Sequence, residues 1–163
     1  VWLYVSIPKK DKFELVVQKA TELGVSHIIP IISERTEKQN IKWERVEKIA
    51  REASEQSERG VMPVIHEMES LKDILERFKE NNQQDNVSNS LYALHISGEK
   101  KFSEINNSDA DKSVGILVGP EGGWGEGDMK LFKEYETPLV SLGEQVLRAE
   151  TASVSVASLL LLG

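Results

Sequence analysis

The chain has 163 residues, no cysteine, and 27 aspartates and glutamates against 20 lysines and arginines, which gives a formal net charge of −7. Its length fits one domain, and the absence of cysteine excludes disulfides, thiolate metal sites and a cysteine nucleophile. The acidic balance also argues against a free-standing nucleic-acid binder, since such proteins usually carry a basic excess.

Strand-like and helix-like segments alternate along the chain. Phe13, Val16 and Ala20 recur at a helical spacing, and Gly24 follows as a stop signal. The predicted strands are residues 1–8, 27–32, 63–66, 91–96, 114–118 and 139–142, and the predicted helices are residues 10–23, 42–58, 71–79, 126–135 and 150–162. This alternation predicts an α/β fold, with helices flanking a mostly parallel sheet, in one domain of residues 1–163.

The remaining stretches and the two ends carry weaker signals. Residues 81–89 and 97–113 are polar, so we expect loops there, the second with a helical turn. Residues 152–162 are apolar but too few to span a bilayer, which predicts a core helix or a helix packed on a partner chain. Residues 1–8 look like a strand and not a signal peptide, so we expect a cytoplasmic protein whose natural N-terminus lies upstream.

Two loops stand out because ligands in open α/β sheets bind beyond the carboxyl ends of the strands. Residues 119–125 follow a strand and include four glycines, which let backbone approach a ligand closely. Residues 142–152 connect another strand to the apolar last helix. The first loop lacks the Gly-Lys-Ser/Thr end of a P-loop, and Asp128 stands where a dinucleotide fingerprint needs its third glycine. A nucleophile elbow and metal-ligand spacing of histidines are absent as well, and a plain turn is the simplest alternative.

The same two loops carry a family resemblance. The sequence LVGPEGGW at residues 117–124, followed by LG-x-x-VLR-x-ETA at residues 142–152, resembles the RsmE-type 16S ribosomal RNA uridine-N3 methyltransferases of the SPOUT superfamily. Earlier segments agree in order: KATELGV at residues 19–25, SERT at residues 33–36, and residues 52–59. The resemblance therefore runs through essentially the whole chain.

The resemblance implies a fold, a cofactor and partners. It implies a C-terminal trefoil knot, S-adenosylmethionine held by the knot loops, 16S ribosomal RNA as substrate, and a homodimer formed through the knot region. No metal and no membrane are expected, because the histidines lack metal-ligand spacing and no membrane segment is visible. Members of the family usually carry a PUA-like RNA-binding domain before the segment that matches Val1, so this chain is expected to hold RNA only weakly. The implied cofactor-binding residues are Val118, Gly119, Pro120, Glu121, Gly122, Gly123, Leu142, Gly143, Val146, Leu147 and Thr151. The implied RNA contacts are Arg35, Gln56, Arg59 and Arg148.

Catalysis at uridine N3 requires loss of a proton, or stabilisation of the anion that remains. Arg148 is the first candidate for stabilising negative charge on the uracil oxygens. Glu121 and Glu150 are candidate proton acceptors if burial raises their pKa toward neutrality. The alternatives are structural: Arg148 in a salt bridge that shapes the loop, and the two glutamates as carboxylates near helix N-termini.

Two other functions stay open at this point. One is a non-catalytic knotted dimer that binds cofactor or RNA, and the other is a small-molecule enzyme that uses the glycine-rich loop for a nucleotide. The charge distribution bears on the RNA partner: residues 34–59 hold seven basic and seven acidic side chains, so the acidity lies elsewhere.

Overall fold

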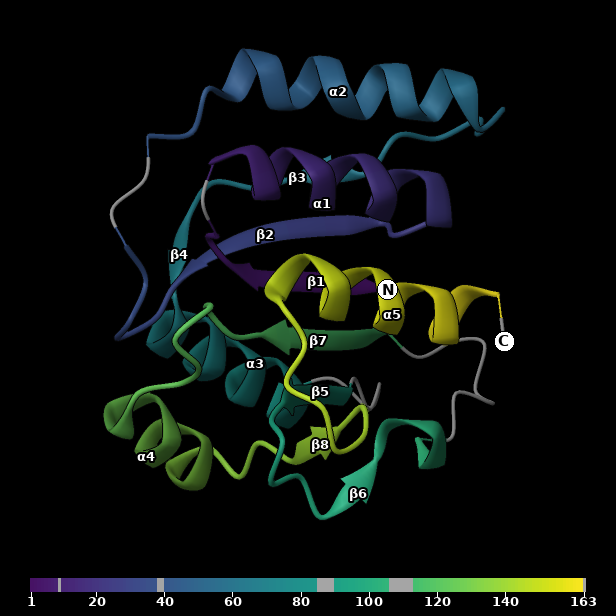
Figure 1. The fold of residues 1–163 in the computed structure, drawn as a ribbon. Coiled ribbons are helices and arrows are strands. Elements are labelled where there is room, and N and C mark those ends of the chain that lie inside the picture. The colour runs from purple at the N-terminus through teal and green to yellow at the C-terminus, as the bar shows by residue number, and fades with distance from the viewer. Residues whose placement is uncertain (9, 38–39, 85–89, 106–112, 163) are drawn as a thin grey trace.

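The computed structural model describes residues 1–8, 10–37, 40–84, 90–105 and 113–162. Its centre is an eight-stranded sheet in the order β3-β2-β1-β7-β5-β8-β6, with β4 also paired to β2, and all of these pairs are parallel (Figure 1). The strands are β1 (Trp2–Ser6), β2 (His27–Ile32), β3 (Val64–Ile65), β4 (Glu69–Ser70), β5 (Ser90–Leu94), β6 (Lys100–Lys101), β7 (Val114–Val118) and β8 (Leu139–Ser141). The predicted parallel α/β fold is confirmed.

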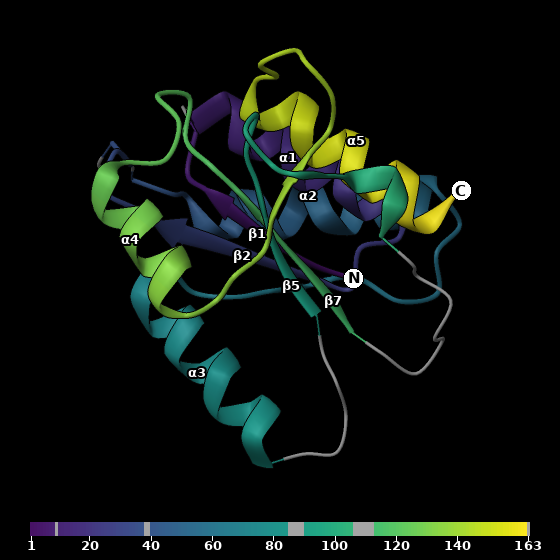
Figure 2. The ribbon, with the colours of Figure 1, turned by 90° about the horizontal axis from the view of Figure 1, so that it is seen from below.

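Helices cover both faces of the sheet. The helices are α1 (Lys10–Leu23), α2 (Trp43–Gln56), α3 (Leu71–Gln84), α4 (Glu126–Glu134) and α5 (Ala149–Leu161), with a 3-10 turn at Phe102–Glu104. Figure 2 shows α1 and α5 on one face and α3 and α4 on the other, and α2 packs against α1 on the side away from α5 (Figure 1). Two clusters of buried apolar side chains, one on each face, hold these layers together.

Two short strands, β4 and β6, were not predicted from the sequence. β4 and β6 have two residues each, too few to show alternation or an apolar run. α3 continues to Gln84, beyond the predicted end at residue 79, because apolar spacing marks where a helix packs and not where its backbone hydrogen bonds stop. The predicted loop at 81–89 therefore begins inside α3, and its residues 85–89 lie outside the described part of the chain.

The C-terminal helix is a core element on one side. Ala152, Val156 and Ala157 are buried where α5 packs against α1, β1 and β7, whereas Leu159 and Leu162 are exposed. Among the described residues, no helix is long and apolar enough to cross a membrane. This arrangement places the carboxyl ends of β7, β5 and β8 side by side, with the start of α5 above them.

Candidate functional site

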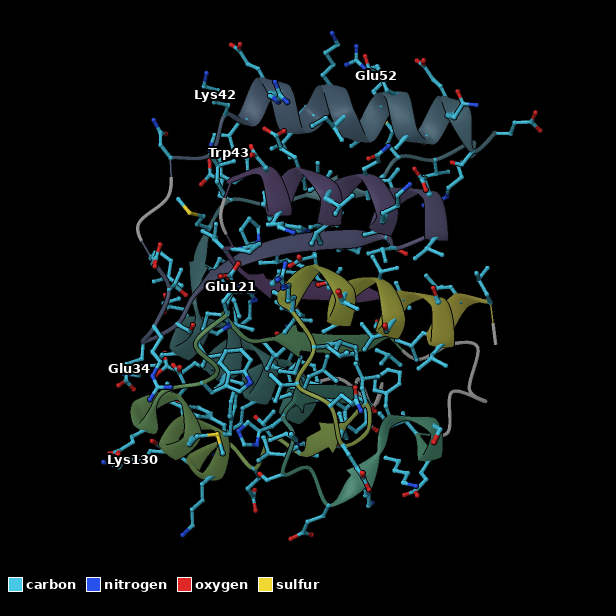
Figure 3. All side chains as sticks on the ribbon, viewed as in Figure 1. Glu34, Lys42, Trp43, Glu52, Glu121 and Lys130 are labelled. Carbon is cyan, nitrogen blue, oxygen red and sulfur yellow. The ribbon has the colours of Figure 1, made fainter. Side chains whose placement is uncertain are left out.

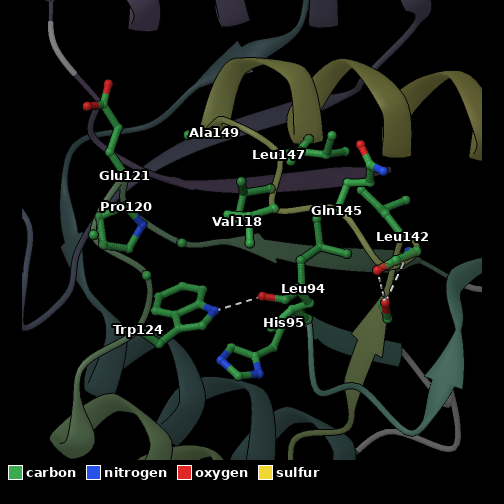
Figure 4. A pocket seen from close by; sticks show the side chains of 18 residues that line it. Leu94, His95, Val118, Pro120, Glu121, Trp124, Leu142, Gln145, Leu147 and Ala149 are labelled. Carbon is green, nitrogen blue, oxygen red and sulfur yellow. Dashed lines mark hydrogen bonds between the residues drawn. The ribbon is translucent and has the colours of Figure 1, made fainter.

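A cavity of about 340 Å³ lies beyond the carboxyl ends of β7, β5 and β8 (Figure 4). Three segments form it: the end of β5 with the residues that follow, the glycine-rich loop after β7, and the loop from β8 to α5. The lining residues are Leu94, His95, Ile96, Val118, Gly119, Pro120, Glu121, Gly122, Gly123, Trp124, Ser141, Leu142, Gly143, Gln145, Val146, Leu147, Ala149 and Ala152. The two loops singled out from the sequence thus face a common cavity.

The glycine-rich loop is fixed by a turn and by Trp124. The backbone N–H of Gly123 donates to the carbonyl of Pro120 (2.8 Å), which closes the turn. The Trp124 indole N–H donates to the carbonyl of Leu94 (2.9 Å), and its ring meets Phe132 edge-on with centroids 5.0 Å apart. Trp124 therefore joins the loop to β5 and to α4 while it forms part of the cavity wall.

The loop between β8 and α5 turns at Gly143. Its φ of +136° is a conformation that side-chain-bearing residues rarely adopt, which explains the glycine. The Ser141 hydroxyl accepts the N–H of Gly143 (3.0 Å) and donates to its carbonyl (2.8 Å), so the turn is locally closed. The loop presents Leu147 to the cavity and leaves Val146 81% exposed.

All of the predicted cofactor-binding residues except Thr151 line this cavity. Thr151 is exposed on α5, where its carbonyl accepts the hydroxyl of Ser155. Leu94 and Ile96 are additions that sequence analysis did not predict. No local pattern marks them, because their place in the wall depends on β5 lying between β7 and β8 in the sheet.

The three candidate catalytic residues are placed differently. Glu121 lines the cavity, and Figure 4 shows its carboxylate at the rim, pointing away from Trp124. Arg148 is the N-cap residue of α5, is exposed, and makes no ion pair within the described part of the chain. Glu150 is buried in the first turn of α5, and one of its carboxylate oxygens accepts a hydrogen bond from Lys12 Nζ at 2.6 Å.

The condition for Glu150 to act as a proton acceptor, a pKa raised by burial, is not met by its surroundings. Burial alone raises the pKa of this carboxyl, but the hydrogen bond from Lys12, a backbone hydrogen bond, and the charges of Lys12 and Arg148 leave the pKa below its ordinary value. A carboxylate with a lowered pKa is a poor proton acceptor near neutral pH. The position favours the structural alternative, in which Glu150 holds the start of α5 to α1.

The candidate RNA contacts do not gather at one place. Arg35 Nη1 donates to the carbonyl of Gly122 (2.7 Å), so Arg35 touches the glycine-rich loop. Arg59 Nη1 donates to the carbonyl of Thr21 (2.6 Å), at the end of α1, and Gln56 is the last residue of α2. In parallel strand-helix units the helix runs back to the amino edge of the sheet, so the ends of α1 and α2 lie opposite the cavity.

The Lys12–Glu150 pair gives a first testable prediction. We expect Lys12→Met to lower the free energy of unfolding by about 1 kcal/mol at pH 7, because a buried carboxylate loses its charged donor. The folded-state pKa of Glu150 lies below its ordinary value of 4.5, so the stabilisation is present above that value and is lost as pH falls through the folded-state pKa. Urea unfolding at pH 7 and in acid measures this difference.

A matched control for this variant is Lys48→Met. Lys48 pairs with Glu52 at 3.7 Å, but both side chains are largely exposed, so its loss should change stability little. Equal effects of the two variants, or an effect of Lys12→Met that does not shrink in acid, would contradict the prediction.

Comparisons with known proteins give one consistent result. A family model described as an RNA methyltransferase domain matches residues 1–161. Ribosomal RNA small subunit methyltransferase E of Rickettsia conorii is 38% identical over 164 residues, covering 99% of this chain and 64% of the relative. The protein of the same name from Bacillus subtilis is 32% identical over 168 residues, covering 93% of this chain and 61% of the relative. The chain thus spans less than two thirds of these relatives.

Solved structures agree on the fold. Ribosomal RNA small subunit methyltransferase E from Neisseria gonorrhoeae, bound to S-adenosylmethionine, matches with a TM-score of 0.78 and 30% identity over 96% of this chain and 62% of that one. A methyltransferase from Legionella pneumophila with the same cofactor matches with a TM-score of 0.80 and 26% identity, over 98% of this chain and 65% of that one.

Proposed function

Because the chain belongs to the RNA methyltransferase family whose domain model matches residues 1–161, we propose that it carries the active site of an S-adenosylmethionine-dependent enzyme that methylates N3 of a uridine in 16S ribosomal RNA. The observation that carries this proposal is that the glycine-rich loop and the loop from β8 to α5 line one common cavity. The cofactor named for similar structures gives the donor, and the names of the relatives give ribosomal RNA as the acceptor. The N3 position follows from the motif resemblance.

The residues around the cavity fit the proposed cofactor. Its volume of about 340 Å³ lies within the usual range for small-molecule sites. Leu94, Leu142 and Leu147 supply apolar walls suited to a purine ring, and the glycine-rich loop offers backbone groups for the polar parts of the ligand. When bound, S-adenosylmethionine supplies a methyl group activated by a sulfonium centre.

The chain's own residues then act on the acceptor. Arg148 sits at the start of α5, next to the cavity-lining Leu147 and Ala149, where its guanidinium stabilises negative charge on a uracil oxygen. Glu121 keeps the role of acceptor for the N3 proton through its place at the rim of the cavity, because its side chain is exposed and the burial expected for that role is absent. Glu150 is assigned a supporting role, because Lys12 holds it as a buried carboxylate.

The partners remain part of the proposal. A homodimer would cover the apolar side chains that the C-terminal region leaves exposed, among them Leu159 and Leu162. The trefoil knot and weak RNA binding by this chain alone follow from the resemblance, and the strand order is consistent with a SPOUT fold. A cytoplasmic location is proposed because residues 1–8 do not look like a signal peptide.

The experiment that tests this function has two stages. Calorimetric titration should show binding of S-adenosylmethionine and none of ATP. Incubation with unmethylated 16S ribosomal RNA and labelled cofactor, followed by nucleoside mass spectrometry, should yield 3-methyluridine. Binding of ATP alone would overturn the proposal in favour of a nucleotide enzyme. The assay is repeated with a longer protein that also contains the segment present in the relatives but not in these 163 residues. If that protein binds the cofactor but transfers no methyl group, a non-catalytic module is favoured.

A further inference from the structure

The segment between β2 and α2 lies against the glycine-rich loop, although about 90 residues separate them in sequence. Figure 3 shows Glu34 beside the start of α4. The proposed reaction assigns no role to Glu34, and the resemblance assigns Arg35 to RNA. The contacts of both residues point instead to the loop itself.

Glu34, from the segment between β2 and α2, caps the first turn of α4. The backbone N–H of Gly127 donates to Glu34 Oε2 at 2.6 Å. In return, the backbone N–H of Glu34 donates to Asp128 Oδ1 at 3.1 Å, and the other oxygen of Asp128 accepts the N–H of Gly125 at 2.9 Å. Asp128 is only 3% exposed. Two carboxylates from distant parts of the chain thus satisfy N–H groups that the helix leaves free.

The glycines at the start of α4 make room for this carboxylate. A Cβ atom at Gly125 would lie 2.3 Å from the Glu34 carboxyl group, and one at Gly127 would lie 2.7 Å from Glu34 Oε2. Gly125 does not line the cavity. The missing side chain at Gly125 thus leaves the space that the Glu34 carboxyl group occupies.

Arg35 contacts the middle of the glycine-rich loop, on the other side of Trp124. Its Nη1 donates to the carbonyl of Gly122 at 2.7 Å, and Gly122 lines the cavity. Charged donors make stronger hydrogen bonds than neutral ones, so this contact restrains the loop tip. Glu34 and Arg35 therefore bind backbone groups on both sides of Trp124, at Gly127 and at Gly122.

The segment that bears these two side chains is itself anchored. The Ser33 hydroxyl is buried and lies 3.1 Å from the hydroxyl of Ser6 at the end of β1. Thr36 Oγ1 accepts the backbone N–H of Ser33 at 2.9 Å and lies 2.8 Å from its hydroxyl. The ends of β1 and β2 thus provide a fixed base for Glu34 and Arg35.

We propose that Glu34 and Arg35 are positioning residues that hold the glycine-rich loop, residues 119–125, in its cofactor-binding conformation. The inference rests on the proposed function for the identity of the ligand. It assigns to Arg35 an effect on cofactor affinity that precedes any contact with RNA. It also explains why Ser-Glu-Arg-Thr accompanies the glycine-rich motif in one chain.

The test compares Glu34→Ala and Arg35→Ala with the conservative Glu34→Gln and with Arg51→Ala, which removes an exposed cation of α2. Calorimetry without RNA should show the affinity for S-adenosylmethionine falling about tenfold in the two alanine variants. Glu34→Gln keeps an acceptor for the Gly127 N–H and should stay within about threefold of the wild type, as should Arg51→Ala. With RNA present, the alanine variants should raise KM for the cofactor and leave kcat at saturating cofactor unchanged.

Hydrogen–deuterium exchange of the unliganded chain gives a readout that does not depend on the cofactor. The amide of Gly127, which donates to Glu34, should exchange faster in Glu34→Ala than in Glu34→Gln, whereas the amide of Gly125 is bonded to Asp128 and should change less. Unchanged exchange together with unchanged cofactor affinity would overturn the inference, and an Arg35→Ala variant that raises only KM for RNA would return Arg35 to RNA contact. Faster exchange in a chain that binds no S-adenosylmethionine would refute the proposed function while supporting the positioning role.

Discussion

Gly98→Ala should destabilise the chain by about 3 kcal/mol and weaken cofactor binding with it. A Cβ atom at position 98 would lie 2.5 Å from the carbonyl carbon of Val140, 2.6 Å from the nitrogen of Ser141 and 2.7 Å from the Cα of Val140. These are backbone atoms of β8, which cannot move without breaking the sheet. The shift would reach the cavity, because Ser141 lines it and the Gly98 N–H donates to the carbonyl of the lining residue His95.

Gly60→Ala is the matched control for this substitution. A Cβ atom there would have no neighbour within 4 Å, so the change should leave the urea midpoint nearly unmoved. Urea unfolding and calorimetric titration of both variants make the comparison. Equal urea midpoints for Gly98→Ala and Gly60→Ala would contradict the close contact between the backbone at Gly98 and β8.

Arg148→Ala should reduce kcat for methyl transfer by about 100-fold while the affinity for S-adenosylmethionine stays within about threefold of the wild type. The side chain does not line the cavity, so cofactor contacts remain, whereas charge stabilisation on the uracil is lost. Arg148→Lys should recover only part of the rate, because an ammonium group does not offer the planar donor pair of a guanidinium.

Single-turnover kinetics with saturating cofactor measure the effect of Arg148. Lys130→Ala, which removes an exposed cation of α4, controls for the loss of one positive charge. A kcat that is unchanged in Arg148→Ala would assign this residue to shaping the loop and would remove it from the mechanism. A loss of cofactor affinity as large as the loss in kcat would lead to the same conclusion.

Several elements were predictable because their signals are local. The bounds of α1, β2 and β7 coincide with the predicted ranges, since an apolar face at helical spacing or a continuous apolar run specifies each of them. The two loops that line the cavity were predictable for a similar reason, as each follows an apolar strand and carries a distinctive run of residues. Gly143 marks its turn because few other residues adopt its φ.

Contacts between distant segments were beyond sequence reasoning. Lys12 and Glu150 are 138 positions apart, and the hydrogen bond between them is the largest of the contributions that lower the pKa of Glu150. Arg59 bonds to the end of α1 at the edge opposite the cavity, although its motif accompanies the others in sequence. The hydrophobic spacing of a sequence does not indicate which helix end contacts which loop.

By itself, the sequence determined the α/β class, most of the helices and strands, and the pair of loops that forms the cavity, because each depends on hydrophobic periodicity or on backbone constraints within a few residues. The tertiary structure decided the strand order that places Leu94 and Ile96 in the cavity wall, the burial of Glu150 against Lys12, and the grip of Glu34 and Arg35 on the glycine-rich loop. These features depend on how the sheet orders its strands, and that order is set by packing over the whole chain.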